Sequence, residues 1–184
     1  MQIQRGLKSG SSLARFVLGA HPIIEHFVEM MRVREIIGTY VRSDKRMRLD
    51  DDKALVLLIH NILTTPNALY EMQDWLQPLD AEKVGLAPRE CKFIQDDRIG
   101  RALARFYHSR HKDVFFHLAL RAIKIFRLDC SRVHQDTTSV TFSGKYPGWS
   151  VRELLAHGIN KDHRPDLKQL VLGLNVTGDS AVPI

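Results

Sequence analysis

Apolar residues recur at intervals of three and four from residue 22 to about residue 128, a period typical of amphipathic α-helices. Pro22 occupies a favourable first helical position before IIEHFVEMMRVREIIGTYV, so we expect a helical start there. In LDDDKALVLLIHNILTT the aspartates can cap a helix and face the positive end of its dipole, and Pro66 ends it. Another helix is predicted between Asn67 and Pro78. This half of the chain is therefore predicted to be mainly helical.

The segment DDRIGRALARFYHSR carries an apolar and a basic stripe, both at helical spacing. The basic stripe consists of Arg98, Arg101, Arg105 and His108. Such a stripe is usually solvated surface, but this one adjoins SRHK, which contains Lys112, so it is also a candidate for contacting phosphates. The helix that follows, DVFFHLALRAIKIFRL, is apolar nearly all round, so it is predicted to be buried with one polar strip exposed.

After Cys130 the pattern changes from helical to extended. In RVHQDTTSVTFSGKY, β-branched residues predict a strand that must stop at Gly144 and the following Pro-Gly pair. Side chains two apart on a strand share a face, which places His134, Asp136 and Thr138 together. Two interpretations of this face remain open: an edge strand with a solvated side, or a carboxylate presented from a sheet to bind a metal.

A second strand is predicted from Gln169 to Val176, and Thr177-Gly178-Asp179-Ser180 predicts a hairpin turn into a third strand that has barely begun at residue 184. We therefore expect three regions. Residues 1–17 form a flexible basic N-terminus, residues 18–129 a helical domain that binds DNA, and residues 130–184 an incomplete α/β domain.

Composition sets the class of protein. The 184 residues are 44% hydrophobic, which is enough for one good-sized core or two small ones. Only Cys91 and Cys130 are present, far apart, so neither a disulfide framework nor a zinc ribbon is indicated, and a reducing cytosol is expected. The longest uninterrupted apolar run, ALVLLI, is far below the roughly 18 to 20 residues of a spanning helix. We expect a cytoplasmic protein with no export signal and no membrane partner.

The net charge of +6 is unevenly distributed along the chain. Residues 1–50 and 101–150 carry +4 and +6, whereas residues 51–100 carry −4 and the remainder is neutral. Such segregation suits a polyanionic partner that is contacted at selected faces. It favours nucleic acid as a partner without identifying one.

Two segments carry a resemblance to a known family. HQDTTSVTFSGKY, followed by HGINKDHRPDLKQLVLGLNVTGDSAVPI, resembles the start of the catalytic domain in bacterial insertion-sequence transposases of the Asp-Asp-Glu class. The stretches LGAHPIIEHFVEMMRVREIIGTYV and LVLLIHNILTTPNALYEMQDWL are similar to the N-terminal domain, of uncharacterised role, that precedes it in one group of them. The resemblance covers nearly the whole chain from about residue 18, and NKDHRPDLKQLVLGL is its most specific part.

The resemblance implies a mainly α N-terminal domain followed by an incomplete α/β ribonuclease-H-like domain, whose first strand carries the first catalytic acid, here Asp136. In that family three carboxylates hold two Mg²⁺ ions, or Mn²⁺, that activate water and then a 3′-hydroxyl for attack on DNA phosphodiesters. The other two acids lie on later elements, which are expected beyond Ile184. Asp162, Asp166 and Asp179 belong to other segments and do not replace them. The catalytic domain is thus expected to be truncated, to bind metal poorly and to be inactive alone.

The NKDHRPDLK segment has its own alternatives. Lys161, Arg164 and Lys168 are candidate contacts for the DNA backbone, or the charges of the loop pair locally with its two aspartates. The histidines at 157 and 163 with those aspartates also raise a zinc or non-haem iron site, but their spacing fits no named ligand motif.

Three functions remain open from the sequence. The first is a partial DNA transposase, and the second is a stand-alone DNA-binding module that competes with the complete enzyme for element ends. The third is a metal-dependent hydrolase or a helical interaction protein with no DNA role. Double-stranded DNA at the element ends is the expected partner, with association of the bound protein with the bacterial nucleoid and self-association as further expectations. Salt-dependent binding to duplex DNA separates the first two functions from the third.

Overall fold

The computed structural model describes residues 16–42, 44, 46–144, 155–158 and 163–184. The chain separates into two compact units, residues 1–118 and 119–184, and each is described by itself. The division falls inside helix α6 (His111–Phe126). The predicted boundary near residue 129 lies just after that helix. Within the described residues, no helix combines the length and the hydropathy that crossing a bilayer requires.

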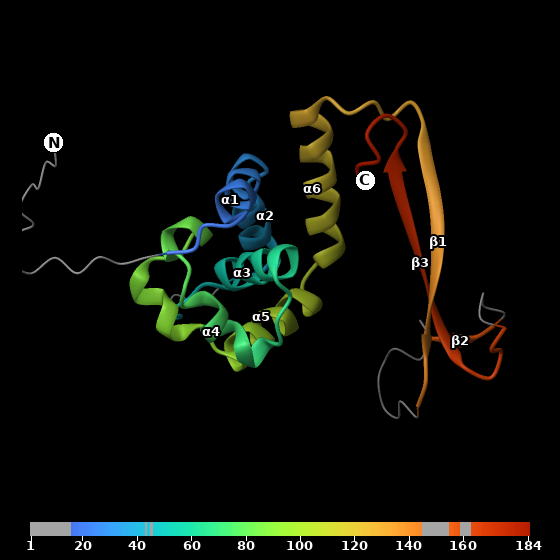
Figure 1. The fold of residues 1–184 in the computed structure, drawn as a ribbon. Coiled ribbons are helices and arrows are strands. Elements are labelled where there is room, and N and C mark those ends of the chain that lie inside the picture. The colour runs from blue at the N-terminus through green and yellow to red at the C-terminus, as the bar shows by residue number, and fades with distance from the viewer. Residues whose placement is uncertain (1–15, 43, 45, 145–154, 159–162) are drawn as a thin grey trace, which may run out of the picture. The chain divides into compact units, whose positions relative to one another are not determined.

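The first unit is helical, and α3 lies at its centre (Figure 1). Ala54, Val56 and Leu57 of α3 are fully buried against apolar side chains of the surrounding elements. Helices α1, α2 and α5 all contact α3. The elements in chain order are α1 (His21–Met30), α2 (Val33–Tyr40), α3 (Asp51–Thr64), η1 (Leu69–Glu71), α4 (Met72–Leu76), η2 (Ala81–Val84), η3 (Pro88–Phe93), α5 (Asp96–His108) and the start of α6, where η denotes a 3₁₀ helix.

The helical stretch predicted to begin at Pro22 is two helices rather than one. Arg32 adopts a left-handed conformation, with φ of 53°, between α1 and α2. The break brings Arg34 back to Glu25, and its Nη1 and Nη2 donate to both carboxylate oxygens at 2.6 and 2.8 Å. In one continuous helix these residues would be separated by about 13.5 Å along the axis. Tertiary pairing therefore divides a segment whose periodicity is continuous.

A buried polar network extends from this ion pair. Nε2 of the buried His60 lies 3.2 Å from Glu25, and the Nδ1 atoms of His60 and His21 are 3.2 Å apart. Because the Glu25 carboxylate can only accept, His60 carries its proton on Nε2, and a neutral His60 accepts at Nδ1. His21 then donates from Nδ1. Gly85, with φ of 73°, lies against the network, because an added Cβ would clash with Nη2 of Arg34.

Helix α6 is less buried than its composition predicts. In its first half, Val114 is buried and Leu118 packs against the core, four residues apart on one face. Phe115 and Phe116, which point to other faces, are more than half exposed. The prediction of a helix buried nearly all round is wrong, because the core contacts only one of its apolar faces.

The second unit contains an antiparallel sheet with strand order β1-β3-β2. Strands β1 (Val133–Phe142) and β3 (Lys168–Thr177) pair over ten residues and lie side by side in Figure 1. Both were predicted, β3 to within one residue at each end. The chain then turns, and Val176 pairs with Pro183, as the predicted hairpin requires. Strand β2 (Ala156–His157), which pairs with the start of β3, is too short for any sequence pattern.

Candidate nucleic-acid interface

The basic stripe of α5 is anchored by a buried carboxylate. Asp51, the first residue of α3, is fully buried. Arg105 donates from Nε and Nη2 to its two oxygens at 2.8 and 2.7 Å, and Nη1 of Arg98 lies 2.8 Å from Oδ1. Arg98 also donates from Nε and Nη2 to the carbonyl oxygen of Leu49, at 3.1 and 2.6 Å. Two arginines of the stripe therefore join α5 to the start of α3.

These contacts change the protonation equilibrium of Asp51. Burial raises the pKa of its carboxyl, but hydrogen bonds from Arg105 and Arg98 outweigh burial and hold the pKa below its usual range. The same pairing raises the pKa of Arg105. Asp50, the N-cap residue of α3, makes no side-chain capping bond. The prediction that these aspartates cap the helix is wrong for Asp50, and Asp51 makes stronger charge-assisted bonds to the arginines.

The predicted phosphate-contacting residues accordingly differ in what they can reach. The side chain of Arg98 is only 12% exposed and donates to Leu49 besides pairing with Asp51, so it is the least accessible of the three arginines in the stripe. Arg105 is 35% exposed and Arg101 60% exposed. Arg101 pairs with Asp97 at 3.4 Å, in a solvated ion pair of the kind that contributes little to stability. Lys112, near the start of α6, is exposed.

Two adjoining hollows run along α5, with volumes of about 280 and 420 Å³. Arg101 and Arg105 line both of them. Arg48 joins them in the first hollow, and Arg42 and His108 join them in the second. We call these five side chains the basic groove. All five lie in the first unit.

Arg42 and Arg48 were missed by the sequence analysis. They lie in the irregular segment between α2 and α3, where helical periodicity does not apply. The signal that could have found them is composition, because RSDKRMR places four basic residues within seven. The ring of Phe93 helps to position Arg48, whose guanidinium carbon lies 5.2 Å from the ring centroid. The groove therefore draws its charge from two segments that are distant in sequence.

Asp136 lies in the middle of β1, in register with Leu174 of β3. It is exposed, and its Oδ1 accepts a hydrogen bond from the backbone N–H of Thr137 at 2.8 Å. Among the described residues no group of three His, Cys, Asp or Glu side chains could hold a metal ion. One carboxylate opposite a leucine does not fit a pair of Mg²⁺ ions, which need several oxygen ligands. Asp136 alone is therefore not a complete metal site.

The basic residues predicted near β3 have mixed outcomes. Arg164 donates from Nε and Nη2 to both oxygens of Asp166, at 2.8 and 2.7 Å, and these bonds lower the pKa of Asp166 to about 2. This is the local pairing that was the alternative to DNA contact. Lys168 is half-buried as the first residue of β3. Lys161 lies outside the described residues, as does Asp162.

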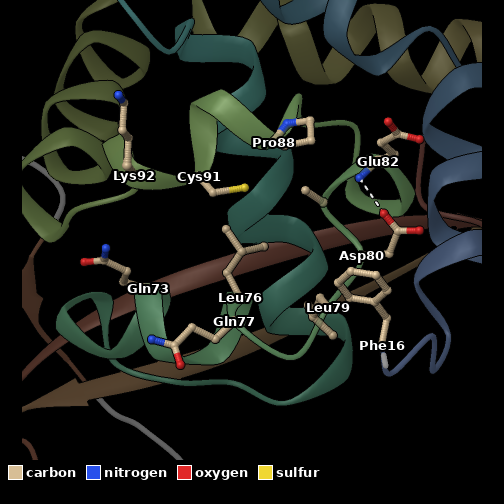
Figure 2. A pocket seen from close by; sticks show the side chains of 11 residues that line it. Phe16, Gln73, Leu76, Gln77, Leu79, Asp80, Glu82, Pro88, Cys91 and Lys92 are labelled. Atoms are coloured by element: carbon tan, nitrogen blue, oxygen red, sulfur yellow. Dashed lines mark hydrogen bonds between the residues drawn. The ribbon is translucent and has the colours of Figure 1, made fainter. Parts of the chain in front are cut away.

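A third hollow of about 680 Å³ lies among α4, η2 and η3 (Figure 2). Asp80 and Glu82 lie together at one end, where Oδ1 of Asp80 accepts from the backbone N–H of Glu82 at 3.1 Å and caps η2. Leu76 and the partly buried Cys91 line its wall. Burial raises the pKa of the Cys91 thiol, so the thiol is protonated at neutral pH and is not an activated nucleophile.

This environment predicts different reactivity for the two cysteines. Iodoacetamide should alkylate the exposed Cys130 well before the partly buried Cys91, because thiolate population and access both disfavour Cys91. Mass spectrometry of timed samples at neutral pH measures the two rates in one reaction. In Cys130→Ser the fast phase should disappear and the slow phase should remain. Equal rates at the two sites would contradict the environment described for Cys91.

Residues 16–120 match a domain of unknown function, DUF4277, over more than half of the chain. The matched residues contain the whole basic groove and the anchoring Asp51. No curated protein and no solved structure matches the chain. The chain therefore belongs to the DUF4277 family.

Proposed function

We propose that this protein binds DNA through the basic groove, as part of an insertion-sequence transposase of the Asp-Asp-Glu class. The observation that carries the binding proposal is the convergence of Arg42, Arg48 and Arg101 on two adjoining hollows beside the anchored Arg105. Guanidinium groups bind phosphate oxygens through charge-assisted bonds, often two at a time. A row of them in a hollowed surface suits a strand with regularly spaced phosphates.

The anchoring by Asp51 supports this role. A flexible surface arginine loses side-chain entropy when it orders on a ligand. Arg105 is already ordered by Asp51, yet its side chain remains 35% exposed and lines both hollows. The groove thus combines one pre-positioned guanidinium with others that are more exposed. Such an arrangement lowers the entropic cost of binding a phosphate.

The transposase part of the proposal rests on the sequence resemblance. Its support in the second unit is the position of Asp136 in β1, a strand that pairs with β3. Strand β3 is itself followed by a turn that brings Pro183 back to Val176. In this proposal β1 and β3 are the first two principal strands of a ribonuclease-H-like domain, and Asp136 is the first of its three acids. A stand-alone DNA-binding module is the second candidate, and it is favoured by the confinement of the basic groove to the first unit.

Arg101→Gln should weaken binding to duplex DNA and reduce the slope of log K against log salt by about 0.9 for each DNA phosphate that the side chain neutralises. The side chain is exposed, so the fold should be unaffected. Lys83→Gln is the matched control, because Lys83 is an exposed residue of η2 that lines neither hollow and its replacement changes net charge equally. Fluorescence anisotropy over a salt series measures both quantities. Identical slopes for the two variants would exclude the groove as the DNA site.

A further inference from the structure

The basic groove borders a surface of different chemistry. Another hollow, of about 400 Å³, shares Arg101 with the groove but is also lined by Tyr70, Asp96 and Asp97. Its two carboxylates make it a poor site for phosphate. Tyr70 is 74% exposed, far more than a tyrosine that packs in a core. This hollow is therefore suited to an uncharged ligand group with hydrogen-bond donors.

Small residues of α5 leave space in this hollow. Gly100 and Ala104 line the hollow, and Tyr107 follows them at spacings of four and three, so the three share one face of α5. A Cβ added to Gly100 would meet no atom within 4 Å outside the helix itself. Gly100 and Ala104 thus lie between two exposed tyrosines, Tyr70 on the side of Gly100 and Tyr107 on the side of Ala104. We call these four residues the tyrosine strip.

Tyr107 is held in place yet remains accessible. Its ring stacks on His111, with centroids 5.7 Å apart and planes within 11°, and lies nearly perpendicular to the ring of His108, with centroids 5.3 Å apart. It is nevertheless 57% exposed. His108 also lines the basic groove, so one imidazole contacts both surfaces. The tyrosine strip and the basic groove are therefore adjacent and share Arg101 and His108 at their border.

The two surfaces together match the two halves of a nucleotide. The arginine side fits phosphate, whereas the tyrosine side fits a flat, uncharged ring. Bases stack on exposed aromatic side chains without regard to sequence, and this stacking is a principal source of affinity in single-strand binding. The carboxylates of Asp96 and Asp97 can accept hydrogen bonds from exocyclic amino groups of bases. In a closed duplex the faces of the bases are already stacked on one another and only their edges are accessible.

We propose that the tyrosine strip binds unpaired bases of a DNA strand whose backbone lies in the basic groove. This inference rests on the proposed DNA-binding function. It adds a preference for DNA that is gapped, forked or locally opened over closed duplex. The bases stack on Tyr70 and Tyr107 while Arg101 contacts the intervening phosphates.

Binding of the complete chain to a duplex and to the same duplex with a short single-stranded gap tests this. The gap carries 2-aminopurine, whose fluorescence is quenched by stacking. The wild-type protein should bind the gapped DNA roughly tenfold more tightly for each stacked base and quench the probe. Tyr107→Ala and Tyr70→Ala should lose that preference and the quenching, whereas Tyr107→Phe should keep both. Duplex affinity should stay unchanged in all three variants, which also shows that they fold.

A steric variant gives an independent test. An added Cβ at Gly100 meets no atom within 4 Å, so Gly100→Leu should project a side chain over the strip, abolish the preference for gapped DNA and leave duplex affinity unchanged. Equal wild-type affinity for both DNAs without quenching would overturn the tyrosine strip but leave the basic groove standing. Wild-type preference in both alanine variants would do the same. Failure to bind either DNA would overturn both proposals.

Discussion

Asp51→Asn should lower the free energy of unfolding by about 3–5 kcal/mol, the usual cost of removing one partner from a buried ion pair. The carboxylate is fully buried and joins Arg98 and Arg105 to the start of α3. An asparagine cannot balance their charge, so Arg98, which is only 12% exposed, would be left buried and uncompensated. Urea unfolding followed by far-ultraviolet circular dichroism measures the decrease in stability.

Asp97→Asn is the matched control for that experiment. Its carboxylate is 77% exposed and lies 3.4 Å from Arg101, so the decrease should stay below about 1 kcal/mol. Replacing Asp51, Arg98 and Arg105 together with apolar residues of similar volume should recover most of the stability that Asp51→Asn removes. Equal effects of the two aspartate substitutions would show that Asp51 does not anchor α5.

Acidification should destabilise the helical unit in two stages. Burial, and then electrostatic repulsion from His60 when that ring is also protonated, lowers the pKa of His21 below 6.5 in the folded state. The unfolded chain therefore takes up this proton first, and the free energy of unfolding falls as pH drops below 6.5 until the lower folded pKa is passed. Glu25 acts at lower pH. Burial raises its pKa, but hydrogen bonds from His60 and Arg34 outweigh burial and set it at about 2, against 4.5 when unpaired.

Glu25 thus adds about 3 kcal/mol to the free energy of unfolding above pH 4.5, and this stabilisation is lost as pH falls from there toward 2. Urea unfolding at a series of pH values measures both stages. His21→Asn keeps an amide donor toward His60 but does not titrate, so it should flatten the first stage. Glu25→Gln should remove the second and lower stability at neutral pH. Glu29 is an exposed residue of the same helix, so Glu29→Gln should preserve both stages. A wild-type stability that does not change from pH 7 to 3 would show that the buried network does not stabilise the fold.

Sequence patterns predicted the elements whose signals are local. The apolar stripe and end signals of α3, the stripe of α5 and the β-branched run of β1 all lie within single segments, and these three elements are present. The break between α1 and α2 was missed because it depends on Arg34 reaching Glu25, a tertiary contact that leaves the periodicity intact.

The candidate site was predicted only where its residues share one helix. Helical spacing correctly placed Arg101 and Arg105 on one face of α5, but spacing cannot reveal which residues of other elements that face contacts. Arg98 shares the spacing and is nevertheless committed to Asp51 and Leu49. Arg42 belongs to an irregular segment, so only tertiary structure brings it to α5. The DNA-binding role of the groove and the catalytic role of Asp136 stay predictions.

The sequence separation within the buried ion pair has a consequence for the order of folding. Asp51 begins α3, and Arg105 follows 54 residues later on α5. Until α5 docks, complete packing of α3 would bury an ionised carboxylate without a partner, which is costly. The preceding helices should therefore remain loosely packed during synthesis. Helices α3 and α5 should gain protection from hydrogen exchange together rather than in chain order.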